Sequence, residues 1–338
     1  MTHRLSLWLL TGGLLLTQPG RSQELHVELR EAGTNASFRG LSVVNDEIAW
    51  ASGTKGTVVK TLDGGRTWKL FTVPGMEQAD FRSIYAFDGR KAIIANVGSP
   101  GHILRTEDGG ERWTTVYTNT DPETFVDGVA FWNEQEGIAY GDPIKGRMLM
   151  LKTIDGGLSW QELESSPRLE PGEASFAASG TGIRCFGDSD ILVCTGGTVS
   201  RLWHSADKGV TWTSRQPPVV QGKSSTGIFS VAVDGRWMAV GGDFQDEALH
   251  TNHHFYSDDQ GKTWQTPRVT ARGYRECVEF LGHRLWLAAG PSGVDLSRDD
   301  GITWSAFSDT KGLHVIRKAR TGTRVLAAGS QGTILRLR

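Results

Sequence analysis

The sequence predicts an all-β protein, a seven-bladed β-propeller of four-stranded antiparallel blades that is closed by an N-terminal strand. Three observations predict this fold. Glycine accounts for 43 of the 338 residues, which disfavours helices because an interior glycine costs a helix roughly 0.5–1 kcal/mol relative to alanine. An eight-residue pattern ending in tryptophan recurs six times. Short apolar segments separated by polar turns fill the intervals, as expected for strands.

The repeated octet has the form Ser/Thr-x-Asp-x-Gly-x-x-Trp, and it is typical of a hairpin turn. Its aspartate can accept hydrogen bonds from nearby backbone N–H groups, and its glycine can adopt positive φ. The tryptophan can then bury its ring on the strand that follows. The six copies occupy residues 61–68, 106–113, 153–160, 205–212, 257–264 and 297–304. We therefore predict a structural role for the six aspartates, which are Asp63, Asp108, Asp155, Asp207, Asp259 and Asp299.

The intervals between octets set the number of blades. Each interval holds an apolar strand, a polar turn and a second apolar strand ending in glycine, as in residues 41–53. Each octet therefore belongs to one four-stranded meander. Residues 313–338 supply three strands without an octet, and residues 24–33 supply a single strand. Joining these two segments completes a seventh blade and removes two open sheet edges, whereas six and eight blades are the alternatives.

The first 22 residues have the pattern of a secretory signal peptide. Basic Arg4 precedes the apolar stretch 5–16, and the small residues Gly20 and Ser22 precede a cleavage point. A buried first strand or helix is the alternative interpretation. We thus expect an exported protein, periplasmic or secreted, whose mature residues 23–338 form one propeller domain. No cysteine adjoins the cut, so we expect no lipid anchor, and the apolar stretch is too short for a transmembrane span.

Composition narrows the classes of ligand. The chain has 36 basic and 38 acidic residues, a net charge of −2, so nucleic acid is not an expected partner. No phosphate-binding loop or zinc-protease motif is present, and we expect no cofactor. His250, His253 and His254 match no standard metal spacing, so no metal site is predicted. Cys185 and Cys194 flank a predicted hairpin turn symmetrically, which suggests a disulfide in an exported protein.

The six octets are identified as the Asp box, or BNR repeat, of sialidases and other propellers. Further segments resemble the photosystem II assembly and stability factor-like propellers, namely residues 38–46, 50–58, 131–143, 172–181, 225–233 and 240–244. This resemblance implies a non-catalytic factor that helps to assemble a membrane complex. It therefore implies an exported or membrane-complex protein as the partner.

Polar residues that differ from one blade to the next lie at one mouth of the central channel, which makes this mouth a candidate ligand-binding site. The innermost strand of each blade begins at this mouth, and we align those strands at 38–41, 81–84, 125–129, 173–177, 225–229, 274–278 and 313–316. The side chains brought there are predicted to be Arg39, Arg82, Asp127, Glu173, Ser225 or Thr226, Arg275 and His314.

Two interpretations of this mouth are open. Arginine presents a planar donor fork to carboxylate or phosphate, so three arginines predict a site for an acidic sugar or another small anion. The alternative is that the arginines pair with the carboxylates within the channel. A register slip of one residue would turn these side chains into the blades, where an arginine is costly to bury, and this cost favours the channel-facing register.

Sialidases offer an enzymatic precedent, in which three arginines grip the substrate beside a tyrosine nucleophile. Arg39 resembles the first of those arginines. This resemblance makes Tyr274 or Tyr140 a candidate nucleophile, with Asp127 and Glu173 as carboxyl groups. Our first hypothesis is nevertheless a monomeric, non-enzymatic binding or assembly factor that uses the arginine-lined mouth. A sialidase-like glycoside hydrolase or a polysaccharide lyase acting at the same mouth is the alternative.

Overall fold

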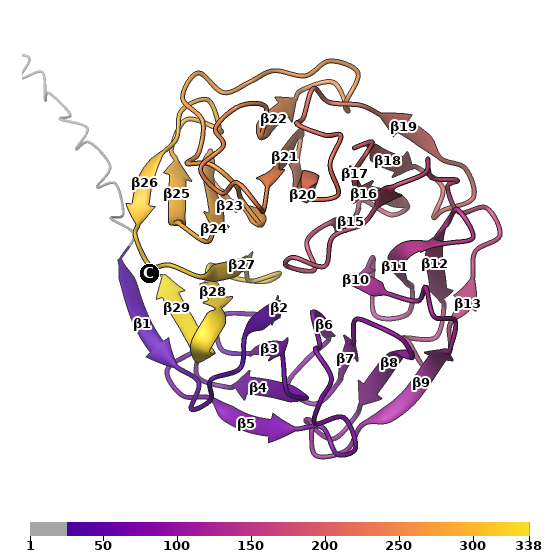
Figure 1. Cartoon of the computed structure of the whole chain (residues 1–338). Helices are drawn as coiled ribbons and strands as arrows, with labels where there is room; N and C mark the ends of the chain where they lie inside the picture. The colour runs from indigo at the N-terminus through magenta and orange to yellow at the C-terminus, as the bar shows by residue number, and fades with distance from the viewer. Residues whose placement is uncertain (1–25, 338) are drawn as a thin grey trace, which may run out of the picture.

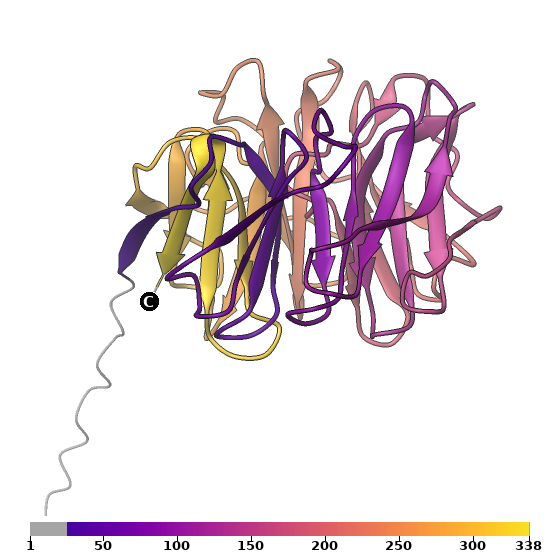
Figure 2. The same ribbon diagram turned by 90° about the horizontal axis from the view of Figure 1, so that it is seen from below.

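Seven antiparallel sheets surround a central channel in the computed structural model, which describes residues 26–337 (Figure 1). The predicted signal peptide at residues 1–22 lies outside the described residues. In side view, most strands run along the axis of the ring (Figure 2). The predicted seven-bladed β-propeller is confirmed.

The first three blades follow the chain in strict order. Blade 1 consists of β2 (Phe38–Val43), β3 (Ala49–Gly53), β4 (Thr57–Thr61) and β5 (Lys69–Thr72). Blade 2 consists of β6 (Ser83–Ala86), β7 (Ala92–Ala95), β8 (Gly101–Thr106) and β9 (Thr114–Asn119). Blade 3 consists of β10 (Val126–Phe131), β11 (Gly137–Ile144), β12 (Arg147–Thr153) and β13 (Gln161–Glu162).

Blades 4 and 5 are interleaved, and blade 5 departs from the four-stranded pattern. Blade 4 consists of β15 (Ile183–Phe186), β16 (Asp190–Cys194), β18 (Leu202–Ser205) and β19 (Thr213–Arg215). Blade 5 consists of β20 (Thr226–Asp234), β21 (Arg236–Asp243) and β22 (His254–Ser257), extended at its inner edge by β17 (Gly196–Gly197) and β14 (Glu173–Ala174). A single bridge between Tyr256 and Gln265 stands where its outer strand would be.

The last two blades close the ring. Blade 6 consists of β23 (Cys277–Gly282), β24 (Leu285–Gly290), β25 (Gly293–Ser297) and β26 (Ser305–Ser308). Blade 7 consists of β27 (Leu313–Lys318), β28 (Val325–Gly329), β29 (Thr333–Leu337) and β1 (Val27–Glu31), with the 3₁₀ turn η1 (Ser330–Gly332) before β29. Strand β1 pairs antiparallel with β29, from Val27 opposite Leu337 to Glu31 opposite Thr333. The predicted closure by an N-terminal strand is confirmed.

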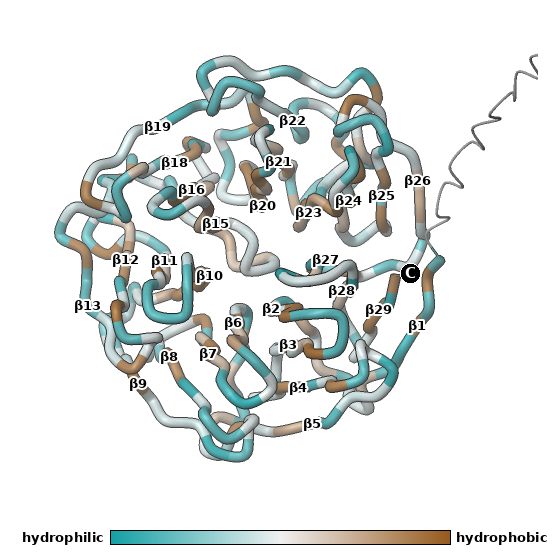
Figure 3. Tube along the Cα trace, turned by 180° about the vertical axis from the view of Figure 1, so that it is seen from behind, coloured by the Kyte–Doolittle hydropathy of each residue, from teal (hydrophilic) through white to brown (hydrophobic). Residues whose placement is uncertain are grey.

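The core lies between adjacent blades. Hydrophobic segments follow the strands, whereas many connecting segments are hydrophilic (Figure 3). Trp50 and Trp286, on the second strands of blades 1 and 6, are fully buried. Because each blade buries both faces against its neighbours, the ring has seven similar apolar layers. Within residues 26–337 no helix has the length and apolar character needed to span a bilayer.

The Asp boxes fold as turns between the third and fourth strands. In the box of blade 4, the Ser205 hydroxyl donates to Asp207 Oδ1 at 2.8 Å and accepts the Gly209 N–H at 2.8 Å. The hydroxyl and backbone N–H of Thr211 both donate to Asp207 and lower the pKa of that carboxyl to about 2. The first of these contacts recurs in every box. Each aspartate thus stabilises its own turn.

The cysteine pair does not lie as the sequence suggested. In the hairpin of β15 and β16, Cys185 is opposite Ile191, and the N–H of Cys194 donates to Gly182 O. Cys185 packs in the layer shared with blade 3, whereas Cys194 packs in the layer shared with blade 5. The two thiols therefore lie on opposite faces of the sheet and are free, as is the buried Cys277. The residue opposite Cys185 is thus three positions before Cys194, the partner that symmetric spacing implies.

Candidate functional site

A cavity of about 340 Å³ opens at the mouth of the channel where the inner strands begin. We call this cavity the mouth site. Strand β2 carries Arg39, and Arg82 immediately precedes β6. The other principal lining side chains are Phe176, Phe229, Phe244, Tyr274, Glu247 and Glu276.

The segment 175–182 covers part of the mouth. The sequence alignment assigned residues 173–177 to the inner strand of blade 4, but that strand is β15. Residues 173–174 instead extend blade 5, and the chain then crosses to β15 past the mouth. Arg39 Nη1 donates to Ala178 O at 2.7 Å, and Ser179 Oγ donates to Glu276 O at 2.8 Å. These bonds tie the covering segment to blades 1 and 6.

Aromatic rings form one wall of the mouth site. Phe176 and Phe229 stack with their ring centroids 3.9 Å apart and an interplanar angle of 9°. Phe244 meets both rings edge-on, at 6.3 and 6.2 Å, and remains 44% exposed. Tyr274 packs edge-on against Phe229. A large exposed aromatic side chain in a concave site is a surface suited to an apolar ligand group.

Arg39 is held by a buried network that joins blades 1, 6 and 7. Its Nη1 lies 2.6 Å from Glu276 Oε2, which also lies 2.9 Å from His314 Nδ1. Burial opposes ionisation of Glu276, but Arg39 and His314 hold its pKa below the usual value. Because the ionised carboxylate can only accept, Nδ1 carries the proton. In neutral His314, Nε2 is then the acceptor that faces Ser37 Oγ at 3.2 Å.

Arg82 is paired at the start of blade 2, the blade next to that of Arg39. Its Nε donates to Asp80 Oδ2 at 2.7 Å, and both side chains are partly exposed. The ionisable lining residues Arg39, Arg82, Glu247 and Glu276 sum to zero charge. The mouth site is therefore lined by arginines but is not a positively charged pocket.

Arg275 does not reach the mouth. It is fully buried beside blade 6, where its Nε donates to Asp295 Oδ2 at 2.8 Å and its Nη2 pairs with the same oxygen. Nη1 donates to Tyr274 O and to Ser292 Oγ. The neighbouring Glu276 faces the network instead, so the side chains here are one residue out of the predicted register. The cost of burying the arginine is offset by Asp295, a partner that strand spacing does not predict.

Glu173 and Thr226 make ion pairs and hydrogen bonds within the blades and do not face the mouth site. Glu173 pairs with Arg201, and its Oε1 accepts from Thr195 Oγ1 at 2.7 Å. Burial opposes ionisation of this carboxyl, but Arg201 and Thr195 hold its pKa below the usual value. Thr226 Oγ1 donates to Lys223 O at 2.9 Å within a turn. Ser225 and Thr226 are both buried, and none of the three residues lines the mouth cavity.

Asp127 is a buried carboxyl beneath the mouth. It is 0% exposed in β10, and neither carboxyl oxygen has a hydrogen-bond partner among the described residues. The nearby backbone N–H of Asp142 donates to Phe125 O instead. Burial and the neighbouring Asp142 raise its pKa well above the usual value, against the opposing effect of Arg82. Tyr140 and Tyr274, the candidate nucleophiles, are also buried, and burial raises the pKa of both phenols.

Replacing Asp127 with asparagine is expected to stabilise the protein at neutral pH by roughly 1–3 kcal/mol, because the variant buries no ionisable acid. The raised pKa fixes the sign of the pH dependence. Stability of the wild type falls as the pH rises from the unfolded-state pKa, near 4, towards the folded-state pKa. The gap to the variant should widen across that range in urea unfolding curves. A variant that tracks the wild type at every pH would contradict the assignment.

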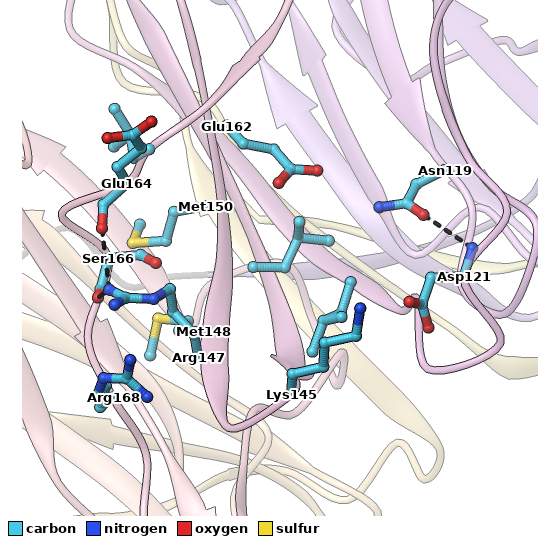
Figure 4. A pocket seen from close by; sticks show the side chains of 13 residues that line it. Asn119, Asp121, Lys145, Arg147, Met148, Met150, Glu162, Glu164, Ser166 and Arg168 are labelled. Carbon is cyan, nitrogen blue, oxygen red and sulfur yellow. Dashed lines mark hydrogen bonds between the residues drawn. The ribbon is translucent and has the colours of Figure 1, made fainter.

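A second cavity lies at the rim, beside the outer strands of blades 2 and 3, and has a volume of about 720 Å³ (Figure 4). It lies where the chain after β13 bulges away from β12, between the bond from the Leu163 N–H to Met150 O and the bond from the Met148 N–H to Pro167 O. Arg147 Nη1 donates hydrogen bonds to Glu164 O at 2.9 Å and to Ser166 O at 2.7 Å. Opposite charges are mixed around the hollow, which gives it no selectivity for an ion.

The histidine segment serves the fold. His253 Nε2 lies 2.9 Å from Ala271 O, and His254 opens β22 with its Nε2 3.1 Å from Met238 Sδ. The Gly273 N–H donates to His250 Nδ1 at 3.0 Å. No cluster of three or more His, Cys, Asp or Glu side chains suited to a metal ion occurs in residues 26–337.

Comparison with known proteins agrees with the repeat and with the fold. The family model for the photosynthesis system II assembly factor YCF48 matches residues 21–122, and the BNR/Asp-box repeat model matches residues 255–266. The chain is 24% identical over 301 residues to the chloroplastic photosystem II stability/assembly factor HCF136 of Arabidopsis thaliana. That alignment covers 85% of this chain but only 61% of the relative. The photosystem II assembly lipoprotein Ycf48 of Synechococcus is 22% identical, with 90% of this chain and 85% of the relative covered.

Solved structures show the same architecture. A YCF48 structure described as bound to a D1 peptide has a TM-score of 0.67, with 19% identity, and covers 92% of this chain and 96% of that chain. YCF48 from Cyanidioschyzon merolae has a TM-score of 0.65 with 16% identity, and the coverage is 92% and 98%. The chain is thus an Asp-box β-propeller that resembles the photosystem II assembly and stability factors.

Proposed function

We propose that this propeller is an exported assembly factor that holds a segment of a partner protein at the mouth site. The observation that carries the proposal is the exposed Phe244 beside the Phe176–Phe229 stack, in a cavity large enough for a side chain. Protein-binding hot spots are enriched in aromatic groups and arginines, and this wall combines both. The relatives named as photosystem II assembly factors, one of them described with a D1 peptide, support a protein as the ligand.

The charge balance favours an apolar side chain over an acidic sugar as the group that enters the mouth. Arg39 is paired with Glu276 and Arg82 with Asp80, so a free carboxylate would have to displace an internal partner. An apolar group would instead cover Phe244 and leave both ion pairs intact. Apolar burial contributes roughly 25 cal/mol for each Å² removed from water.

Glycosidase or lyase chemistry is the less favoured alternative. The usual retaining or inverting mechanism uses two carboxyl groups flanking the bond that is cleaved, and sialidases use a tyrosine as the nucleophile. Here Asp127 is buried without access, and Glu173 is bound to Arg201 in blade 5. The buried Tyr274 has a raised pKa, which disfavours the phenolate.

The cellular setting is part of the same proposal. The relatives are named as lipoproteins or as chloroplastic proteins, which supports export to a compartment outside the cytoplasm. The sequence of residues 1–22 favours the periplasm or secretion as the destination. We propose that the propeller acts there as a monomer on a partner of a membrane complex.

Selection from a displayed peptide library on the purified propeller tests the ligand class. We expect enriched peptides to share a large apolar side chain, and the D1 peptide serves as a second probe. The matched bait is the Phe244→Ala variant, on which the enrichment should disappear. Enrichment of acidic peptides without an apolar residue, equal on both baits, would contradict the proposal.

A further inference from the structure

The opposite end of the channel holds a second cluster of arginines. Arg184 lies on β15, Arg317 lies on β27 and Arg320 lies two residues after β27. We call these three residues the exit cluster, because the inner strands end here, away from the mouth site. All three line a cavity of about 200 Å³ inside the channel.

The exit cluster carries uncompensated positive charge. Among the described residues that line its cavity there is no carboxylate. The nearby carboxylate is Glu279, which lies 2.8 Å from Arg184 Nη2 and 4.0 Å from Arg317 Nε. Three guanidinium groups against one carboxylate leave a local charge of +2. This arrangement differs from the mouth site, where each arginine has its own acid.

Two of the guanidinium groups are fixed by the protein. Arg184 Nε donates to Val231 O at 2.7 Å, and its Nη2 also donates to Val278 O at 3.1 Å. Arg320 Nη1 donates to Ser42 Oγ at 3.1 Å, its Nη2 donates to Ala86 O, and its guanidinium stacks over the Tyr85 ring at 4.5 Å. These groups cannot swing into solvent without losing their bonds, so the charge stays in the channel.

The third guanidinium is held more loosely. The 4.0 Å ion pair with Glu279 is the one polar contact found for the Arg317 side chain within residues 26–337, and this side chain is 25% exposed. Burial and the neighbouring Arg184 lower the pKa of Arg317 to about 10, against the opposing effect of Glu279. Its two terminal nitrogens are therefore donors available to a ligand in the cavity. Arginine donors in a partly desolvated site bind oxyanions strongly because their planar fork matches two oxygens.

We propose that the exit cluster binds a small dianionic oxyanion, a phosphate or a phosphoryl group of similar size. A dianion matches the excess charge of +2, whereas chloride or acetate would leave half of it unbalanced. A phosphate monoester carries about −1.5 to −2 at pH 7. The site is distinct from the mouth site, so this inference does not depend on the proposed protein ligand.

Thermal unfolding with inorganic phosphate, sulfate, chloride and acetate at matched ionic strength tests the proposal. We expect phosphate and sulfate to raise Tm in a saturable manner, and chloride and acetate to have little effect. A phosphate monoester such as glycerol 3-phosphate distinguishes the two sources. A half-saturating concentration equal to that of phosphate indicates a phosphoryl ligand, and a much weaker response indicates the free ion.

The test variant is Arg317→Gln. The matched control is Arg90→Gln, which removes an exposed arginine from a turn of blade 2. Each is compared with its own Tm without added anion, because Arg317→Gln also removes internal repulsion. We expect at least a tenfold weaker half-saturation by phosphate for Arg317→Gln and no change for Arg90→Gln. A response that is the same in Arg317→Gln and the wild type, or no phosphate-specific rise in the wild type, would overturn the proposal.

Discussion

The Asp295→Ala variant is expected to lose about 3–5 kcal/mol of unfolding free energy, because the change leaves a buried cation without its anion. Arg275 is fully buried and directs both Nε and Nη2 at Asp295. Asp295 also accepts from Arg272 Nε at 2.7 Å, so its loss affects two arginines. The Arg275 guanidinium cannot reach water without moving β23 or β24.

Urea unfolding followed by tryptophan fluorescence measures this loss. The matched control is Asp80→Ala, which removes the partner of Arg82 from a partly exposed pair and should cost at most about 1 kcal/mol. If Asp295→Ala were no more costly than Asp80→Ala, the inward assignment of Arg275 would be wrong. If Arg275 instead faced the mouth, its substitution would weaken ligand binding and leave the unfolding free energy of the protein unchanged.

Replacing Gly329 with alanine is expected to destabilise the propeller by about 3 kcal/mol or more, because the added methyl would overlap backbone. A Cβ built at this residue of β28 would lie 2.1 Å from Gly312 O and 2.8 Å from Leu313 Cα. Neither atom can move without shifting the start of β27. Corresponding glycines lie in the second strands of other blades, where the Cβ would meet backbone at or just before the start of the inner strand at similar distances, namely Gly53, Gly141 and Gly241.

The same unfolding measurement checks the glycine prediction. Gly89→Ala is the control, since its Cβ would meet the ends of two flexible side chains, Leu62 Cδ2 at 3.2 Å and Ile48 Cδ1 at 3.8 Å, and no backbone. Equal stability of the Gly329→Ala and Gly89→Ala variants would show that close approach of strands does not explain these glycines. The glycines of the sequence thus include those in the turns of the Asp boxes, those in other turns with positive φ, and those in second strands near the channel mouth.

The repeat made the fold predictable, whereas the site was predictable only in part. Six octets with regular spacing specify blades, and the two octet-free ends specify the closure by β1. Side-chain direction at the mouth depends on register and on bulges, which spacing does not encode. Strand β2 shifts register between Phe38 and Gly40, and β27 shifts between Leu313 and Val315. Arg39 and His314 lie at those shifts and do meet, through Glu276.

The aromatic wall was missed for a related reason. Phe176 belongs to a crossing segment that the repeat pattern assigned to a strand, and Phe244 follows β21, outside the aligned inner strands. No spacing rule connects these residues to Phe229. Deviation from the repeat was the signal available, because blade 5 has five strands in place of the regular four.

If an apolar group of a protein ligand packs on Phe244, the affinity of a fluorescent peptide from the library selection depends on this side chain. The comparison is between Phe244→Ala and Leu158→Ala, which removes another exposed apolar side chain from the Asp box of blade 3. Truncation of an interface anchor costs at least about 2 kcal/mol. We therefore predict that Kd rises more than tenfold in Phe244→Ala and is unchanged in Leu158→Ala. The same Kd for both variants and the wild type would contradict the account.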